Sequence, residues 1–180
     1  MLKEPMNCGT KVLKFTVLGD AVGQGRPRFT TINGHPKAYD TKQSREEKAA
    51  IRLIAQQAIK EQHWAFPSQD MPVKVEIVSY RQAPRSTQRW LTEAGIGGEV
   101  VPLTKPDVDN VVKLYLDAMN GVVFPDDKQV FEINIRKAYG AEPRAEVAVT
   151  GYYLNLGEIK SVANARLKRK RELENGQQSK

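Results

Sequence analysis

Residues 105–130 decide the predicted fold, and they read KPDVDNVVKLYLDAMNGVVFPDDKQV. Apolar side chains recur at helical spacing in the first half of this stretch, which predicts an amphipathic helix with its apolar stripe facing the core. Gly121 then suits the left-handed conformation that often ends a helix. Residues 122–124 predict a short strand that returns alongside the helix. The stripe consists of Val108, Val111, Val112, Tyr115, Leu116 and Met119.

Aspartates lie at both outer ends of these two predicted elements. The four are Asp107, Asp109, Asp126 and Asp127. A helix from residue 109 to residue 120 rises about 17 Å at 1.5 Å per residue. An extended segment over residues 122–127 covers about 17 Å at 3.3 Å per residue. A chain reversal at Gly121 would therefore bring the four carboxylates to the same level.

Carboxylates packed this closely repel one another unless a cation lies among them. Mg²⁺ prefers oxygen ligands and is usually held by one or two carboxylates plus substrate phosphate. We therefore predict that two or three of the aspartates hold one or two Mg²⁺ ions for the hydrolysis of a phosphodiester. Lys113 follows Asp109 by one helical turn, where its ammonium group would stabilise the growing charge on the scissile phosphate.

Each of these acidic residues also has a simpler interpretation. Asp107 suits the N-cap of the helix, and Asp109 suits the positive end of the helix dipole. An exposed pair of Asp109 and Lys113 would contribute little stability. Asp117 would be a solvated helix residue, and residues 125–127 have an ordinary turn composition. We favour a shared metal site because independent explanations would otherwise have to place carboxylates at matching ends of two neighbouring elements.

Alternating apolar residues predict the other strands of the domain. They lie at residues 11–18, 73–77, 129–137 and 145–153, and the last two are expected to form an antiparallel pair. Residues 82–102 are rich in Arg, Ser, Thr and Gly with weak periodicity, so we expect a mobile loop there.

A hairpin and a second helix complete the predicted elements. Residues 29–39 predict a hairpin that turns at Asn33-Gly34. Ser44 and Glu47 form a capping box for a helix that ends near Gln62. The elements predict an α+β fold, with a mixed, largely antiparallel sheet packed by two main helices in a domain of residues 1–156. Residues 157–180 are expected to form a basic tail that is flexible or helical.

The composition favours a polyanionic partner. The net charge is +7, and Lys and Arg side chains release counterions when they approach phosphates. Cys8 is the only cysteine, so an intrachain disulfide and a Cys-based zinc site are both excluded. The sequence shows no signal peptide and no apolar run of membrane-spanning length, so we expect a soluble, cytoplasmic protein without membrane contact.

Basic residues near the acidic motif and in the tail are candidates for DNA contact. Arg26 and Arg28 flank Pro27 in a glycine-rich loop, and Lys105 directly precedes the acidic motif. The tail carries the cluster Arg166, Lys168, Arg169, Lys170 and Arg171. We expect these side chains to bind DNA phosphates, with the tail acting as a non-specific arm. Solvated loop arginines and a solvated charge run are the respective alternatives.

The acidic motif resembles the signature of RusA-type Holliday-junction resolvases. The resemblance lies in KPDVDN at 105–110 with Lys113, in DAMNGV at 117–122 and in DDKQV at 126–130. GRPR at 25–28, followed by a turn and Tyr39, is similar to the N-terminal region of phage-type members. The resemblance implies small, often prophage-borne homodimeric endonucleases of DNA recombination and repair, which cut four-way DNA junctions by paired, Mg²⁺-dependent nicks.

The resemblance also assigns roles to individual residues. Asp107, Asp109 and Asp127 match the metal-binding aspartates of the family, and Lys113 matches its catalytic lysine. Asp126 matches the carboxylate beside them. The 82–102 segment and the basic tail have no clear counterpart in compact members. Two other functions stay open: a non-catalytic module that binds branched DNA, and a broader nuclease for flaps and other branched DNA.

Overall fold

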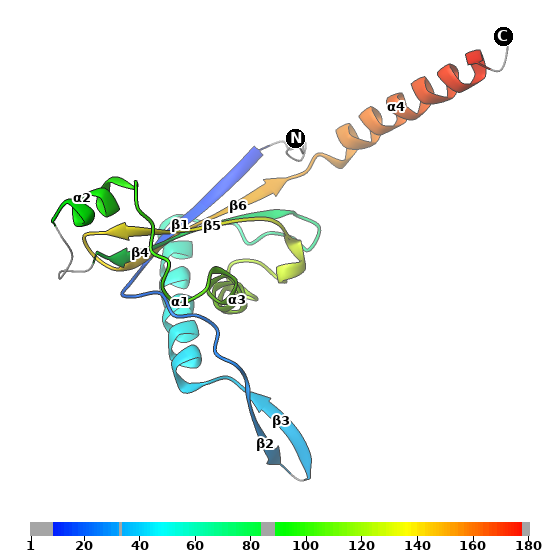
Figure 1. The fold of residues 1–180 in the computed structure, drawn as a ribbon. Coiled ribbons are helices and arrows are strands. Elements are labelled where there is room, and N and C mark those ends of the chain that lie inside the picture. Colours follow the sequence, from blue (N-terminus) through cyan, green and yellow to red (C-terminus); the bar gives the residue numbers. More distant parts are fainter. Residues whose placement is uncertain (1–8, 33, 84–88, 178–180) are drawn as a thin grey trace. The chain divides into compact units, whose positions relative to one another are not determined.

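The structure is a computed structural model that describes residues 9–32, 34–83 and 89–177. The chain divides into two compact units, each described by itself. One unit is Lys11–Gly151, and the other combines Met1–Thr10 with Tyr152–Lys180. Figure 1 traces the elements along the chain. No helix in the described part is long and apolar enough to cross a membrane.

A four-stranded mixed sheet forms the framework (Figure 1). Its strands, in spatial order, are β1 (Gly9–Leu18), β6 (Arg144–Tyr153), β4 (Val73–Gln82) and β5 (Val130–Gly140). β4 runs antiparallel to β6 and parallel to β5. Alternate side chains of β1 and β4 are buried, as a strand with one face on a core requires. The predicted α+β class and mixed sheet are confirmed.

The last two strands run antiparallel to each other, as predicted, but they do not pair with each other. β4 lies between β5 and β6 and hydrogen-bonds to both. Every residue of β4 from Val73 to Arg81 is buried or half-buried, whereas β5 exposes Phe131, Ile133 and Arg136. β4, the more buried of the two strands, lies inside the sheet, and β5 is left at the edge. β5 and β6 follow each other in sequence but are therefore not neighbours in the sheet.

The two main helices are α1 (Lys42–Glu61) and α3 (Val108–Met119), as predicted. α3 buries Val111, Leu114, Tyr115, Ala118 and Met119, while Val108 is 42% exposed. The predicted stripe is thus rotated toward Leu114 and Ala118. The Arg52 side chain of α1 donates to the backbone carbonyls of Asp117 and Ala118, at 3.2 and 3.1 Å. This contact joins the two helices and satisfies carbonyls at the end of α3.

The predicted capping box of α1 is wrong, because the cap lies three residues earlier. Thr41 is the N-cap residue, and its side chain accepts from the Ser44 N–H at 3.2 Å. Ser44 is buried, and its Oγ accepts from the Gly25 N–H at 3.1 Å. Both Thr41 and Ser44 are good capping residues, so the sequence pattern alone did not separate them. The predicted end of the helix near Gln62 is confirmed.

The hairpin prediction is confirmed. β2 (Arg28–Ile32) and β3 (His35–Tyr39) form a separate two-stranded antiparallel sheet. Gly34 has a φ of 79°, the positive value that a tight hairpin turn uses. Asn33 lies outside the described residues.

The predicted strand at 122–124 is wrong. The Gly121 N–H donates to the Phe124 carbonyl at 2.8 Å, and Asn120 pairs with Phe124 in one isolated bridge. A turn therefore replaces the strand, and the short 3-10 helix η1 (Asp127–Gln129) leads into β5. Val123 and Phe124 are both fully buried, which an extended strand over one core face does not allow for consecutive residues. Gly121 has the predicted left-handed conformation, with a φ of 72°.

Two further helices occupy segments whose structure was left open or predicted as loop. α2 (Arg89–Gly97) lies within the 82–102 segment, so the loop prediction is wrong there. A Cβ on the buried Gly95 would lie 2.9 Å from the Tyr139 ring, so glycine permits close packing on β5. Glycine also lowers helix propensity, which hid this helix from the sequence pattern. The tail was predicted to be flexible or helical, and it forms the helix α4 (Leu156–Gln177).

Candidate active site

Asp107 directly precedes α3, and Asp109 lies in the first turn of this helix. Asp107 is the N-cap residue: its carbonyl accepts from the Val111 N–H at 3.1 Å, but its side chain makes no capping hydrogen bond. Both side chains are exposed. The N-terminal end of a helix attracts negative charge, so this position favours the two carboxylates. Among the ion pairs of the described residues, none involves Asp107 or Asp109. The predicted capping role of Asp107 is met by its backbone alone.

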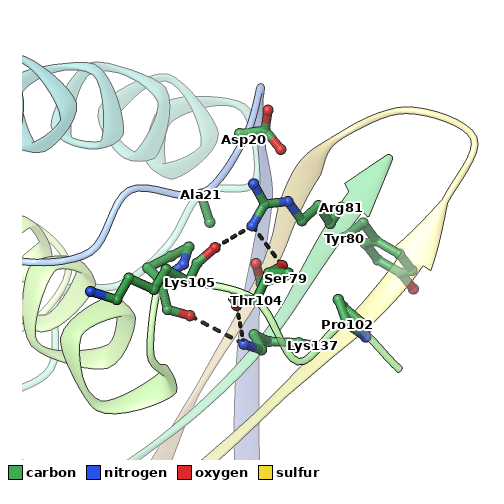
Figure 2. A pocket seen from close by; sticks show the side chains of 10 residues that line it. Asp20, Ala21, Ser79, Tyr80, Arg81, Pro102, Thr104, Lys105 and Lys137 are labelled. Carbon is green, nitrogen blue, oxygen red and sulfur yellow. Dashed lines mark hydrogen bonds between the residues drawn. The ribbon is translucent and has the colours of Figure 1, made fainter. Parts of the chain in front are cut away.

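Two cations from the sheet hold the backbone that leads into Asp107 (Figure 2). Arg81, on β4, donates to the Thr104 Oγ1 at 2.9 Å and to the Lys105 carbonyl. Lys137, on β5, donates to the carbonyls of Thr104 and Pro106 at 2.6 and 3.3 Å. Hydrogen bonds from charged donors are stronger than neutral ones, so this loop is held firmly against the sheet.

Sequence reasoning missed both anchoring residues. Lys137 pairs in register with Ser79 of β4, two residues before Arg81. The two cations thus lie on one face of adjacent strands, because side chains alternate along a strand. The sequence did contain one signal for them: Arg81 and Lys137 are basic residues in the second halves of two strands that are otherwise rich in apolar residues. The strand order, which could not be read from the sequence, is what brings the two together.

An open groove of about 430 Å³ runs beside the start of α3. Asp107, Asn110 and Lys105 line it on one side, and residues 20–24 with Gln43 line the other. The Gln24 N–H donates to the Asn110 carbonyl at 2.8 Å. A Cβ on Gly23 would lie 2.9 Å from the Pro106 Cβ, so only glycine allows this close approach. The volume of the groove lies within the range of small-ligand sites.

Asp20 is a groove residue that sequence reasoning also missed. It lines the groove together with Asp107, and it lines the small pocket between Arg81 and Lys137 (Figure 2). Asp20 follows the end of β1, far from the acidic motif in sequence. Its place beside that motif depends on the packing of the glycine-rich loop on α3, which no local pattern reveals.

The predicted DNA-binding residues near the motif are all exposed. Lys105 lines the groove. Arg26 and Arg28 follow the groove-lining segment directly, and Gly25 just before them is fixed by its hydrogen bond to Ser44. Lys105 thus lies at the groove, and the segment that carries Arg26 and Arg28 begins beside the groove-lining residues 20–24.

Asp126 and Asp127 lie at η1 rather than at the end of a strand. Asp126 caps η1: its carboxylate accepts from the Lys128 N–H at 3.0 Å and lies 3.6 Å from the Lys128 Nζ. The Lys128 N–H holds the pKa of Asp126 below its usual value, because it stabilises the charged form. The turn interpretation of Asp126 is therefore confirmed, while Asp127 beside it is exposed.

The return strand that was to bring these residues to the start of α3 does not exist. Within residues 9–32, 34–83 and 89–177, no group of three or more Asp, Glu, His or Cys side chains is placed to hold a metal ion. The convergence of Asp127 with Asp107 and Asp109 therefore stays a prediction. Lys113 is exposed one turn after Asp109, and among the ion pairs of the described residues none joins the two.

Asp117 has a structural role, so its interpretation as a solvated residue is wrong. The Lys48 Nζ of α1 lies 2.7 Å from Asp117 and 2.8 Å from Asp40. Burial pulls the pKa of Lys48 down, but its hydrogen bonds to Asp117 and Asp40 outweigh burial and raise it. The hydrogen bond from Lys48 likewise lowers the pKa of Asp40. These pairs fasten α3 to α1 and to the end of the hairpin.

The comparison with protein families decides the identification. Residues 19–150 match the family described as Endodeoxyribonuclease RusA. The chain belongs to the RusA endodeoxyribonuclease family. It is also 37% identical over 139 residues to the uncharacterized protein YqaN of Bacillus subtilis (strain 168), a match that covers 76% of this chain and 94% of YqaN. The resemblance stated from the acidic motif is confirmed.

The RusA match contains the groove, α3 and η1, and it ends before α4. The predicted basic cluster of the tail lies on α4, where its side chains are exposed: Arg166, Lys168, Arg169, Lys170 and Arg171. Successive helical residues are separated by about 100° around the axis, so four consecutive basic residues surround the helix. Such an arrangement suits contact with phosphates rather than the reading of one groove.

Proposed function

We propose that this RusA family member is a Mg²⁺-dependent, structure-specific endonuclease that hydrolyses phosphodiesters at Holliday junctions by paired nicks, in DNA recombination and repair. The observation that carries the proposal is the family match over residues 19–150, which contains all five motif residues. These residues are Asp107, Asp109, Lys113, Asp126 and Asp127. The position of Asp107 in an open groove, on a chain of net charge +7, supports a phosphate substrate.

The first turn of α3 fits a divalent metal. Asp107 and Asp109 offer exposed carboxylate oxygens, and Mg²⁺ is usually held by one or two carboxylates, several waters and substrate phosphate. Asp127 is the proposed third ligand, with Asp126 beside it. When bound, Mg²⁺ supplies an activated water and stabilises charge on the leaving oxygen.

The remaining proposed roles belong to basic side chains. Lys113 stabilises the charge that develops on the scissile phosphate. Lys105, Arg26 and Arg28 hold neighbouring phosphates along the groove and beyond it. A homodimer would present one such site to each of two strands of a two-fold symmetric junction, which explains paired nicks.

The test is cleavage of a synthetic mobile four-way junction, a matched flap and a plain duplex during a Mg²⁺ titration. We expect Mg²⁺-dependent paired nicks in the junction, with much slower cutting of the flap and the duplex. Asp109→Asn should lower the cleavage rate by about 100-fold or more while junction binding is retained. Asp70→Asn, at an exposed loop carboxylate, is the matched control and should cut normally.

Three outcomes would contradict parts of the proposal. Undiminished cutting by Asp109→Asn would remove Asp109 from the site. Equal rates on junction and flap would favour the broader nuclease. Binding without any Mg²⁺-dependent product on branched DNA would favour a non-catalytic module.

A further inference from the structure

The hairpin of β2 and β3 is exposed on both of its faces. All five residues of β3 are exposed, and so are residues 28–31 of β2. Its two strands pair only with each other, outside the four-stranded sheet (Figure 1). An isolated two-stranded hairpin is marginally stable in water, so a hairpin with no covered face gains by acquiring a partner.

The strand register divides the hairpin into two chemically different faces. Arg28 lies opposite Tyr39, and Thr30 lies opposite Lys37. These residues and His35 share one face, because side chains two apart on a strand point the same way. Phe29 lies opposite Ala38 on the other face, with Thr31 and Pro36 beyond them. The first face therefore carries the basic side chains together with Tyr39, and the second face, called the apolar face below, has no charged side chain.

Phe29 is the most prominent group of the apolar face. Its side chain is 74% exposed, although a phenylalanine usually gains by burial. The Phe29 ring has only Ala38 directly across from it, so a flat partner can reach it from the solvent side. A nucleic-acid base is such a partner, and stacking of bases on aromatic rings is tolerant of sequence.

Charge selects DNA over a second copy of this chain as the partner. Residues 26–39 carry Arg26, Arg28 and Lys37 and no acidic side chain. The next carboxylate, Asp40, is already paired with Lys48. Two copies of so basic a hairpin would repel each other, whereas phosphates would be attracted.

We propose that the β2–β3 hairpin is a DNA-binding arm, whose basic face lies along the phosphate backbone while Phe29 stacks on a base face that is exposed at a branch point. The proposal rests on DNA being the substrate, as proposed above. It adds Lys37 as a phosphate contact and Phe29 as the group that distinguishes branched from plain duplex DNA. Base faces are exposed where the helical stack is interrupted at a branch point and are covered within a duplex, so the stacking contact depends on structure rather than sequence.

The test measures binding rather than cleavage, with the full chain in metal-free buffer. Fluorescence anisotropy would give the Kd for a labelled four-way junction and for a matched duplex over a series of salt concentrations. The variants are Phe29→Ala, Phe29→Trp and Lys37→Gln. Phe66→Ala and Lys60→Gln are matched controls, because both residues are exposed and lie outside the hairpin. Thermal unfolding would verify that each variant is folded.

Phe29→Ala should weaken junction binding by about 5-fold or more while duplex binding changes little. Phe29→Trp should retain junction affinity and show tryptophan quenching on junction binding beyond that of the unsubstituted chain. Lys37→Gln should weaken binding to both DNAs and lower the salt slope by about 0.9. Both control variants should bind like the unsubstituted chain.

Hairpin variants that bind both DNAs like the control variants would overturn the proposal. So would variants that change the oligomeric state in sedimentation without changing DNA affinity, because the hairpin would then contact a second copy. Failure of the nuclease proposal is a separate result: it would appear as absent cleavage with the hairpin dependence of binding intact.

Discussion

At the scale of single residues, Arg81 and Lys137 connect the sheet to the acidic motif. Their hydrogen bonds end on Thr104, Lys105 and Pro106, directly before Asp107. Neither side chain belongs to the motif, so both are positioning residues. A displacement of about 1 Å in a reacting group can cost about 100-fold in rate.

Replacing Lys137 with Met should therefore slow cleavage more than it weakens DNA binding. We expect the single-turnover rate on a four-way junction to fall by about 10- to 100-fold, with Kd changed less than about three-fold. Lys137→Arg, which keeps a charged donor, should recover most of the rate. Arg136→Met is the control, since Arg136 is the exposed neighbour on the opposite face of β5. Parallel losses of rate, affinity and melting temperature would indicate a merely structural role.

Lys48 carries a pH-dependent part of the stability. The pKa of Asp40 lies below 3.8, so its contribution is present above pH 3.8 and is lost as pH falls through the lowered value. The pKa of Lys48 lies above 10.5, so its contribution is present below pH 10.5 and is lost as pH rises through the raised value. The pair should thus stabilise the fold over the whole range between these limits.

Lys48→Met should lower the free energy of unfolding by about 2 kcal/mol near neutral pH, because two charged hydrogen bonds are lost. Denaturant unfolding from pH 3 to pH 11 would measure the difference in free energy of unfolding between the variant and the unsubstituted chain. This difference should shrink at both extremes of pH. Lys42→Met is the control, since its pair with Glu46 is highly exposed and is expected to contribute at most about 0.5 kcal/mol. A pH-independent difference would refute the ionic origin of the effect.

The acidic motif could be recognised from the sequence because its five residues, from Asp107 to Asp127, lie within 21 positions of the chain. Local spacing correctly placed Asp107 just before α3, and Asp109 and Lys113 on its first half. Asp20, Arg81 and Lys137 were not predicted, because only the tertiary packing brings them to the motif. The proposed meeting of Asp127 with Asp107 rested on a strand that the structure replaces with a turn.

At the scale of elements, the groove depends on how closely the glycine-rich loop approaches α3. A methyl group on Gly23 would meet the Pro106 Cβ at 2.9 Å and the Asn110 Cβ at 3.1 Å. Neither atom can move without shifting its own backbone. The wall that carries Asp20 and the wall that carries Asp107 are therefore fixed to each other at this glycine.

Gly23→Ala should separate these two walls. We expect a loss of about 1–3 kcal/mol in the free energy of unfolding from overpacking, together with slower junction cleavage. Thermal unfolding and a cleavage assay would measure the two effects. Gly9→Ala is the control, because a Cβ there meets no atom within 4 Å. A Gly23→Ala variant as stable and as active as Gly9→Ala would show that the loop adjusts without cost.

Periodicity predicted the main strands and helices, and it failed for residues 122–124 and for α2. β1, α1 and α3 each alternate between core and solvent in the expected pattern. Residues 122–124 are apolar because a turn buries them, so their composition resembled a strand. α2 contains Gly95 and Gly97, and glycine lowers helix propensity, so the sequence of α2 shows only a weak helical pattern.

At the scale of the whole molecule, α4 adds charge outside the RusA match. Its basic residues surround the helix, so we expect non-specific contact with phosphates. Changing Arg166, Lys168, Arg169 and Arg171 to Gln should lower the salt slope of DNA binding by roughly 3 to 4, at about 0.9 per lost phosphate contact. Junction cleavage at low salt should persist, because the proposed catalytic residues lie within residues 19–150. An unchanged salt slope would show that α4 does not contact DNA.

The central claim is that the carboxylates at the start of α3 hold a divalent cation against DNA. Mn²⁺ accepts the same oxygen ligands as Mg²⁺ and can be counted by electron paramagnetic resonance. The most direct measurement is a Mn²⁺ titration of the full chain bound to nicked duplex, the product of the proposed reaction. The unsubstituted chain and Asp70→Asn should bind at least one more Mn²⁺ per chain than the double variant Asp107→Asn, Asp109→Asn. Equal Mn²⁺ binding by all three proteins would contradict a metal site at α3.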